Sequence, residues 1–257
     1  MKNSPYLDVA LEATKIAEKI IRQYYQSDLV VEIKADKSPV TIADQTAEAE
    51  IKKFISTRFK DHNFLGEEGG GGKKESQYTW IIDPVDGTKN FTRGLPFFCT
   101  QLGLMKDDEF VLGVANWPIL GSQMYAERGA GAYLNNEPIT VSKVDKLDES
   151  YFCHGGVKYF KEQGLLDQVA QLSTKTRFSR GWGAEFGQYY LPTGHLDVNV
   201  DAYIEVWDIA AFIVILEEAG GKITDFEGNK VSKETTRIIS TNRLLHDQVV
   251  DYFRSHG

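Results

Sequence analysis

The sequence predicts an α+β or layered α/β protein with two sheet-containing halves that meet near residue 140. Three observations support this prediction: helical apolar spacing near the N-terminus, a series of strand-like segments after it, and an alternation of strands and helices from about residue 141. The chain has 257 residues, 42% of them hydrophobic and 26% charged, which is ordinary for a globular protein. It is long enough for one large domain or two packed subdomains.

The first half, residues 1–140, begins with apolar residues at helical spacing over residues 7–25, with charged residues around the outside. A second helix is expected over 43–59, and the glycine run 69–72 predicts a mobile loop. Strands separated by turn residues are then predicted over Tyr78–Ile82, Phe98–Met105, Phe110–Asn116 and Gln123–Arg128. These strands indicate an antiparallel meander.

The second half, residues 141–257, is predicted to alternate between the two kinds of element. Strands are expected near 151–154, 177–180, 196–200, 221–225 and 237–241. Helices are expected over 159–173, 184–193, 208–219 and 244–254. No internal repeat is evident.

Charge and composition restrict the partners. The formal net charge is −8, which argues against nucleic acid as a partner but leaves a small anionic substrate open, because divalent cations reverse the local charge of an acidic pocket. No membrane span or secretory signal is visible. With Cys99 and Cys153 as its only cysteines, the chain is expected to be cytoplasmic with reduced, packed thiols.

The segment from Trp80 to Phe91 is the most informative. An apolar strand ends in Asp83, Pro84 is expected to stop the strand ladder, and Asp86 follows with Gly87 and Thr88. Carboxylates crowded together at a strand end suit a hard cation such as Mg²⁺. A helix beginning here would offer backbone N–H groups to a phosphate. Taken alone, Asp-Pro-x-Asp-Gly favours an ordinary turn over a metal site, and the other acidic segments change that balance.

Two other segments carry acidic residues beside apolar runs. Glu67 and Glu68 follow the run Phe64–Gly66, although adjacent glutamates are usually solvated loop charges. Asp208 precedes eight consecutive apolar residues, so it begins a buried helix that the Gly220-Gly221 pair terminates. Asp208 could cap this helix, but its charge then requires a partner, which could be a metal, a lysine or an arginine.

Together these segments resemble the inositol monophosphatase family. The resemblance is carried by Val40-Thr41-Ile42-Ala43-Asp44, Gly66-Glu67-Glu68, the segment from Trp80 to Phe91, and the segment from Trp207 to Gly221, in the order of the family. It spans almost the whole chain. It implies a layered αβαβα sandwich of the inositol monophosphatase and fructose-bisphosphatase type.

The resemblance also implies the roles of individual residues. Two or three Mg²⁺ ions per subunit would be held by Glu67, Asp83, the Val85 carbonyl, Asp86 and Asp208. Glu67, Thr88, Asp44 and Thr41 would be catalytic, Asp44 supporting Thr88 or the attacking water. The substrate would be bound by Asp86, Gly87, Thr88, Ala184, Glu185, Asp201 and Asp208. Family members are often homodimers and commonly inhibited by lithium.

The resemblance therefore implies a Mg²⁺-dependent phosphomonoesterase acting on a small alcohol phosphate, with inositol 1-phosphate and L-histidinol phosphate as leading substrates. The segments 37–41 and 180–183 look more like histidinol-phosphate phosphatases, but Ala184 stands where these have an aspartate. Glu185 could replace that aspartate or be a solvated charge. A broad-specificity sugar or fructose-bisphosphate phosphatase, and a non-catalytic metal- or phosphate-binding protein, remain alternatives.

Overall fold

The structure is a computed structural model, which describes residues 3–27, 31–33, 39–70 and 74–256. The predicted loop at 69–72 lies partly outside the described residues. The chain divides into two compact units, Met1–Glu137 with Trp207–Ile215, and Pro138–Val206 with Leu216–Gly257. None of the helices in the described part of the chain is long and apolar enough to cross a membrane.

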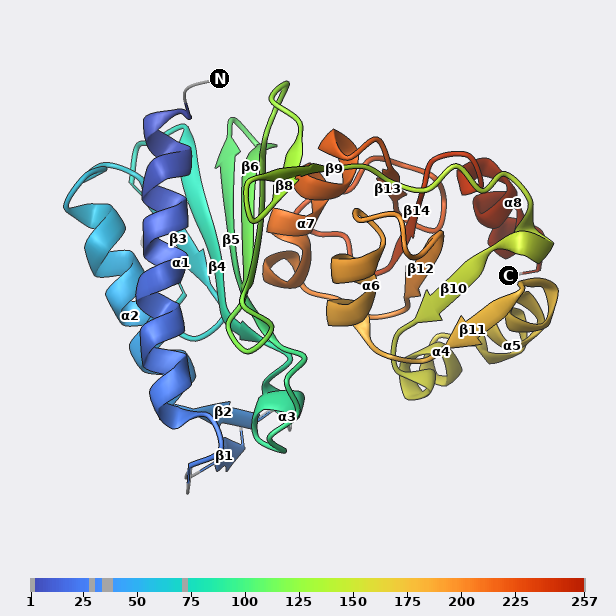
Figure 1. Cartoon of the computed structure of the whole chain (residues 1–257), viewed down its shortest axis with the longest axis horizontal. Helices are drawn as coiled ribbons and strands as arrows, with labels where there is room; N and C mark the ends of the chain where they lie inside the picture. Colours follow the sequence, from blue (N-terminus) through green and yellow to red (C-terminus); the bar gives the residue numbers. More distant parts are fainter. Residues whose placement is uncertain (1–2, 28–30, 34–38, 71–73, 257) are drawn as a thin grey trace. The chain divides into compact units, whose positions relative to one another are not determined.

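The first unit is built on a seven-stranded sheet (Figure 1). In sheet order its strands are β3 (Asn63–Gly66), β4 (Tyr78–Asp86), β5 (Cys99–Lys106), β6 (Glu109–Trp117), β7 (Ser122–Glu127), β8 (Ala132–Leu134) and β9 (Glu137–Ile139). Its helices are α1 (Pro5–Tyr24), α2 (Ile42–Ser56), α3 (Thr88–Phe91) and most of α7 (Val206–Glu218). A separate antiparallel pair joins β1 (Val31–Ile33) to β2 (Pro39–Thr41). The antiparallel pairing from β4 to β7 confirms the predicted meander.

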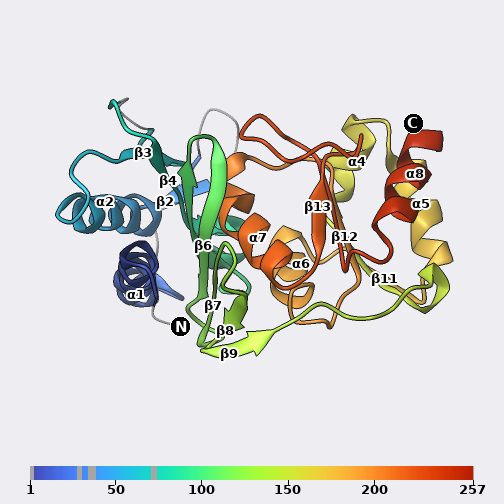
Figure 2. The ribbon, with the colours of Figure 1, turned by 90° about the horizontal axis from the view of Figure 1, so that it is seen from above.

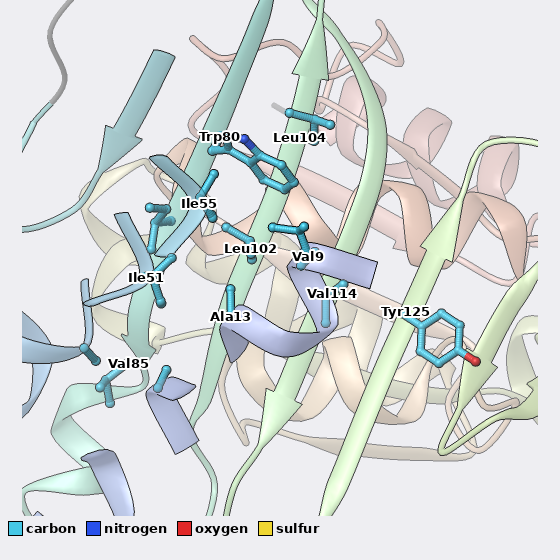
Figure 3. Packing of buried hydrophobic residues seen from close by; sticks show 14 of the residues in the cluster. Val9, Ala13, Ile51, Ile55, Trp80, Val85, Leu102, Leu104, Val114 and Tyr125 are labelled. Atoms are coloured by element: carbon cyan, nitrogen blue, oxygen red, sulfur yellow. The ribbon is translucent and has the colours of Figure 1, made fainter. Parts of the chain in front are cut away.

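Helices cover both faces of this sheet (Figure 2). Leu102 and Leu104 on β5 belong to the hydrophobic core that α1 and α2 close, and Figure 3 shows Val9 and Ala13 of α1 near them. Because successive side chains of a strand point to opposite faces, Gly103 faces the other side. A Cβ built there would lie 2.7 Å from the Cβ of Ala210 on α7. Helix α7 therefore packs on the face opposite α1 and α2.

The second unit contains a five-stranded mixed sheet. In sheet order its strands are β11 (Phe178–Arg180), β10 (Tyr151–His154), β12 (Val198–Asp201), β14 (Ile238–Thr241) and β13 (Lys222–Thr224). Its helices are α4 (Val157–Glu162), α5 (Leu166–Lys175), α6 (Ala184–Tyr190) and α8 (His246–His256), with a short 3₁₀ turn at Leu147–Glu149. All five predicted strands are present, with ends shifted by one or two residues.

The core of the second unit lies between its sheet and the helices α4, α5 and α8. Val198 and Val200 of β12 belong to this core, so Asn199 and Asp201, which alternate with them, face the other side of the sheet. That side carries α6, because a Cβ on Gly187 of α6 would overlap the Asn199 side chain. Cys153 of β10 is a buried free thiol, as is Cys99 in the first unit, which agrees with the expectation from the sequence.

Three local expectations were wrong. The helix expected over 159–173 is two helices, because Gly164 has φ +72° between them. Strand β4 does not stop at Pro84 but continues to Asp86 through a register shift. Helix α7 begins at Val206, so Asp208 lies within its first turn rather than at its cap. The expected end of α7 is confirmed: Gly220 has φ +95°, and the Gly221 N–H donates to the Leu216 carbonyl at 2.9 Å.

Candidate metal and phosphate site

The bulge in β4 places Asp83 and Asp86 on one side of the strand. Asp83 pairs with Gln101 of β5 and Asp86 pairs with Cys99, so β4 advances by one residue more than its partner. On a regular strand, residues three apart point to opposite faces, and one extra residue reverses this relation. Pro84 suits a bulge because it has no N–H to offer the ladder. The same proline that was expected to end the strand thus helps to align the two carboxylates.

The third carboxylate, Asp208, comes from the first turn of α7. Ligand oxygens of Asp83, Asp86 and Asp208 all lie within 4.8 Å of one another. Asp83 and Asp86 are buried and Asp208 is half-buried. The Val85 N–H donates to Asp83 Oδ1 at 3.0 Å, which fixes the orientation of that carboxylate. The sequence placed these three residues in one metal site, and the structure brings them together.

Gln101 connects two of these residues, and the sequence analysis did not identify it. Its Nε2 donates to Asp86 Oδ2 at 2.6 Å and also to the backbone carbonyl of Asp208. The Cys99 thiol lies 3.8 Å from the same Asp86 oxygen. Gln101 is fully buried in a strand that is mostly buried and apolar. A buried glutamine opposite a conspicuous aspartate was the available signal, because buried polar groups need partners.

Electrostatics of the cluster oppose its ionised form. Burial raises the pKa of Asp83 well above its ordinary value, and repulsion from Glu67, Asp86, Asp208 and Asp44 raises it further. Several carboxylates this close are stable as anions only beside positive charge. Oxygen donors in such a cluster match the ligands that Mg²⁺ prefers, and a divalent ion would reverse the effect on the pKa. The residues present therefore fit a divalent cation.

Glu67 lies close to this cluster without being one of the three converging carboxylates. It follows β3, and its N–H donates to the Ile82 carbonyl of β4 at 3.1 Å, one residue before Asp83. Its charge raises the pKa values of both Asp83 and Asp44, although burial is the larger cause for each. Glu67 is thus within electrostatic reach of the cluster.

Thr41, Asp44 and Thr88 form a buried hydrogen-bonded chain. Thr41 caps α2, and both its N–H and its hydroxyl donate to Asp44 Oδ2, the former at 2.8 Å. The Thr88 hydroxyl lies 3.2 Å from Asp44 Oδ1 and 2.9 Å from the Val85 carbonyl, so its single proton goes to one of them. The Thr88 oxygen can then accept a hydrogen bond from a further donor such as water.

Gly87 links this chain to the bulge. Its φ of +91° lies in the left-handed region that favours glycine, and α3 begins at the next residue. Helix α3 has only four residues. Gly87 therefore serves mainly to turn the chain sharply between Asp86 and Thr88.

The predicted substrate residues Ala184, Glu185 and Asp201 belong to the second unit. Asp201 is buried and accepts a hydrogen bond from Asn199 Nδ2 at 2.7 Å. The pKa of Asp201 is raised to about 7, chiefly by burial and also by repulsion from Glu185 in the first turn of α6, while the hydrogen bond from Asn199 opposes the shift. Ala184 is the first residue of α6. Asn199 was not identified from the sequence.

Comparison with known proteins identifies the family of this chain. The model of the inositol monophosphatase family matches residues 2–257. The chain belongs to the inositol monophosphatase family. It is 35% identical over 243 residues to a histidinol-phosphatase of Chlorobaculum parvum, covering 94% of each chain. It is 36% identical over 238 residues to a fructose-1,6-bisphosphatase/inositol-1-monophosphatase of Thermotoga maritima, covering 92% of this chain and 90% of that protein.

Solved structures of this family show the same fold. An inositol monophosphatase structure from Thermotoga maritima superposes with a TM-score of 0.89 at 34% identity, covering 98% of each chain. The extragenic suppressor protein suhB from Bartonella henselae superposes with a TM-score of 0.92 at 29% identity, covering 98% of this chain and 99% of that one. The protein has the α+β fold of inositol monophosphatases and fructose-bisphosphatases, as the sequence predicted. The family is metal-dependent, and Asp83, Asp86 and Asp208 form a cluster that could bind the metal.

Proposed function

We propose that the protein is a Mg²⁺-dependent phosphomonoesterase that hydrolyses a small alcohol phosphate. The observation that carries this proposal is the convergence of Asp83, Asp86 and Asp208 within 4.8 Å, from two segments far apart in the chain. Two or three ions would be held by Asp83, Asp86, Asp208, the Val85 carbonyl and Glu67. Bound Mg²⁺ supplies positive charge for the phosphate and the leaving oxygen, and lowers the pKa of water.

The residues of the chain perform the remaining tasks. The Thr88 hydroxyl donates a hydrogen bond to Asp44 or to the Val85 carbonyl, so its oxygen is available to orient the attacking water. Thr41 holds Asp44 in place for this contact. The sharp turn at Gly87 lets the backbone N–H groups of Gly87 and Thr88 approach the phosphate.

Inositol 1-phosphate and L-histidinol phosphate are the leading substrates in this proposal. Relatives with these activities in their names are 35% and 36% identical, so identity does not separate them. We assign Glu185 and Asp201 to the choice of alcohol, with Ala184 beside them. Because the pKa of Asp201 is about 7, its negative charge and any preference for a cationic alcohol would increase above neutral pH. The name of the Thermotoga maritima relative supports a broad sugar-phosphate phosphatase as the second candidate.

The test measures phosphate release at fixed Mg²⁺ from inositol 1-phosphate, histidinol phosphate, fructose 1,6-bisphosphate and adenosine bisphosphate. We expect release that EDTA abolishes, and a preference above ~100-fold for one substrate would define its class, because such differences require dedicated polar contacts. In the same assay, Asp83→Asn should lower turnover at least ~100-fold.

For the wild type, comparable slow rates on all four substrates would indicate the broad phosphatase. No release from any of them, with Mg²⁺ bound, would favour a non-catalytic binding protein. Homodimer formation and lithium inhibition remain predictions.

A further inference from the structure

An ion pair on α2, formed by the buried Glu48 and the half-buried Lys52, contacts the segment that carries Glu67. Glu48 is only 2% exposed, and its Oε2 accepts a hydrogen bond from the Glu68 N–H at 2.9 Å. Its Oε1 accepts one from Lys52 Nζ at 2.6 Å. Lys52 Nζ also donates to the Gly70 carbonyl at 2.8 Å. We call Glu48 and Lys52 the latch, because together they bind the backbone on the C-terminal side of Glu67.

The segment from Gly66 to Gly69 leaves room for the Glu48 carboxylate. A Cβ at Gly66 would lie 2.5 Å from Glu48 carboxylate atoms, and one at Gly69 would lie 2.8 Å from Glu48 Oε1. Side chains at these positions would therefore displace the carboxylate. Glycine on both sides of Glu67 and Glu68 allows the backbone to approach α2 closely enough for the Glu68 N–H bond.

Glu67 is consequently held from two directions. Its own N–H is bonded to the Ile82 carbonyl of β4, and the next residue is bonded to Glu48 of α2. Glu48 and Lys52 need each other, since a buried carboxylate that loses its partner is destabilised. The latch lies outside the acidic cluster, and its hydrogen bonds reach the cluster through the backbone beside Glu67.

We infer that Glu48 and Lys52 are positioning residues that fix the Glu67 backbone so that its carboxylate is placed for metal binding. This inference rests on the proposed function, in which Glu67 is a metal ligand. Residues that orient a ligand from behind typically change metal affinity or activity by about 10–100-fold when they are replaced. Holding the ligand in advance reduces the ordering that metal binding would otherwise require.

The test compares latch variants with a matched pair on the same helix. Glu48→Gln removes the charge while keeping one acceptor oxygen, and Lys52→Met removes both Nζ bonds at similar side-chain length. Glu50→Gln and Lys53→Met are the controls, because Glu50 and Lys53 form an exposed ion pair on α2 at 3.0 Å. The readouts are calorimetric Mg²⁺ affinity, the Mg²⁺ concentration for half-maximal phosphate release, and hydrogen exchange of the Glu68 amide.

We expect both latch variants to bind Mg²⁺ at least ~10-fold more weakly and to exchange the Glu68 amide faster. Their kcat at saturating Mg²⁺ should stay within about 3-fold of the wild type, and the control variants should match the wild type throughout. A latch variant that unfolds at lower temperature but keeps wild-type Mg²⁺ affinity would overturn the inference, because the pair would then be structural only. A wild type that binds Mg²⁺ without releasing phosphate would contradict the proposed function. In that case the Mg²⁺ affinities of the latch variants would still test whether Glu48 and Lys52 position Glu67.

Discussion

At the scale of single residues, several buried ionisable groups have pKa values that are shifted against their charged forms. Asp83 and Asp44 are buried acids whose pKa values are raised mainly by burial, and Asp201 is a third. Burial disfavours the charged form of each of these groups. They are distributed over both units, and all were singled out from the sequence as site residues. His246, which was not, shows the same effect for a base.

His246 is buried between two threonines in the second unit. Thr224 Oγ1 donates to the Asp225 carbonyl and therefore accepts from the His246 Nε2–H, at 2.9 Å. The Thr241 hydroxyl then donates a hydrogen bond to Nδ1 of the ring, at 3.0 Å. This arrangement suits the neutral ring, since protonation would place two donors against each other. Burial, and to a smaller extent the charge of Lys222, lowers the pKa of His246 to about 4.

We expect His246 to make the protein less stable in acid. The unfolded chain binds a proton at this histidine below about pH 6.5, whereas the folded chain binds it only near pH 4. Stability from this group is complete above about pH 6.5 and is lost as the pH falls towards 4, by on the order of 3 kcal/mol. The measurement is the unfolding temperature between pH 7.5 and 4.5. It should fall less for His246→Gln than for the wild type, and for the exposed His195→Gln variant it should fall as much as for the wild type. Identical declines for His246→Gln and wild type would contradict the assignment.

At the scale of elements, the approach of α7 to the sheet determines where Asp208 lies. Gly103 of β5 and Gly113 of β6 face Ala210 and Ala211, so the helix rests almost directly on the strand backbones. The atoms nearest to a Cβ differ between the two positions. At Gly103 the nearest atom is the Ala210 Cβ, whereas at Gly113 all three nearest atoms belong to the Ala211 backbone.

This difference predicts opposite outcomes for two mutant cycles. Gly103→Ala should destabilise the protein by about 1–3 kcal/mol through overpacking, and Ala210→Gly should recover part of that loss by removing the opposing Cβ. Gly113→Ala should not be rescued by Ala211→Gly, because the clash is with backbone atoms. Urea unfolding of the single and double variants measures both coupling energies. Equal coupling energies in the two cycles would show that α7 does not pack as described.

Element prediction from the sequence succeeded where one pattern dominated. Amphipathic spacing predicted α1 and α2, and the consecutive apolar run after Asp208 predicted α7. It failed where a single residue changed the backbone: Gly164 divided one expected helix, and Pro84 sat in a bulge instead of ending β4. A turn glycine and a helix-interior glycine look alike in sequence, and only pairing with β5 distinguishes a bulge from a strand end.

At the scale of the whole molecule, the convergence of Asp83 and Asp86 with Asp208 is a tertiary property that periodicity does not contain. The resemblance of four separate segments to one family predicted it, and the structure brings the three residues together. Gln101, Asn199 and Glu48 were missed because each is one polar residue in an ordinary pattern. Their importance follows from contacts with Asp86, Asp201 and the backbone beside Glu67.

The central claim is that these acids remain charged together because divalent cations lie between them. It predicts that Mg²⁺ stabilises the fold, by about 2.7 kcal/mol at a concentration 100 times its Kd. Asp83→Asn is the informative variant, because asparagine can still accept the Val85 N–H while removing the most disfavoured charge.

The direct test is the unfolding temperature of wild type and Asp83→Asn, each measured in EDTA and in excess Mg²⁺. We expect Mg²⁺ to raise the unfolding temperature of the wild type clearly and that of the variant much less, with the variant at least as stable as the wild type in EDTA. A wild type whose unfolding temperature does not respond to Mg²⁺, or a variant that responds equally, would contradict the claim.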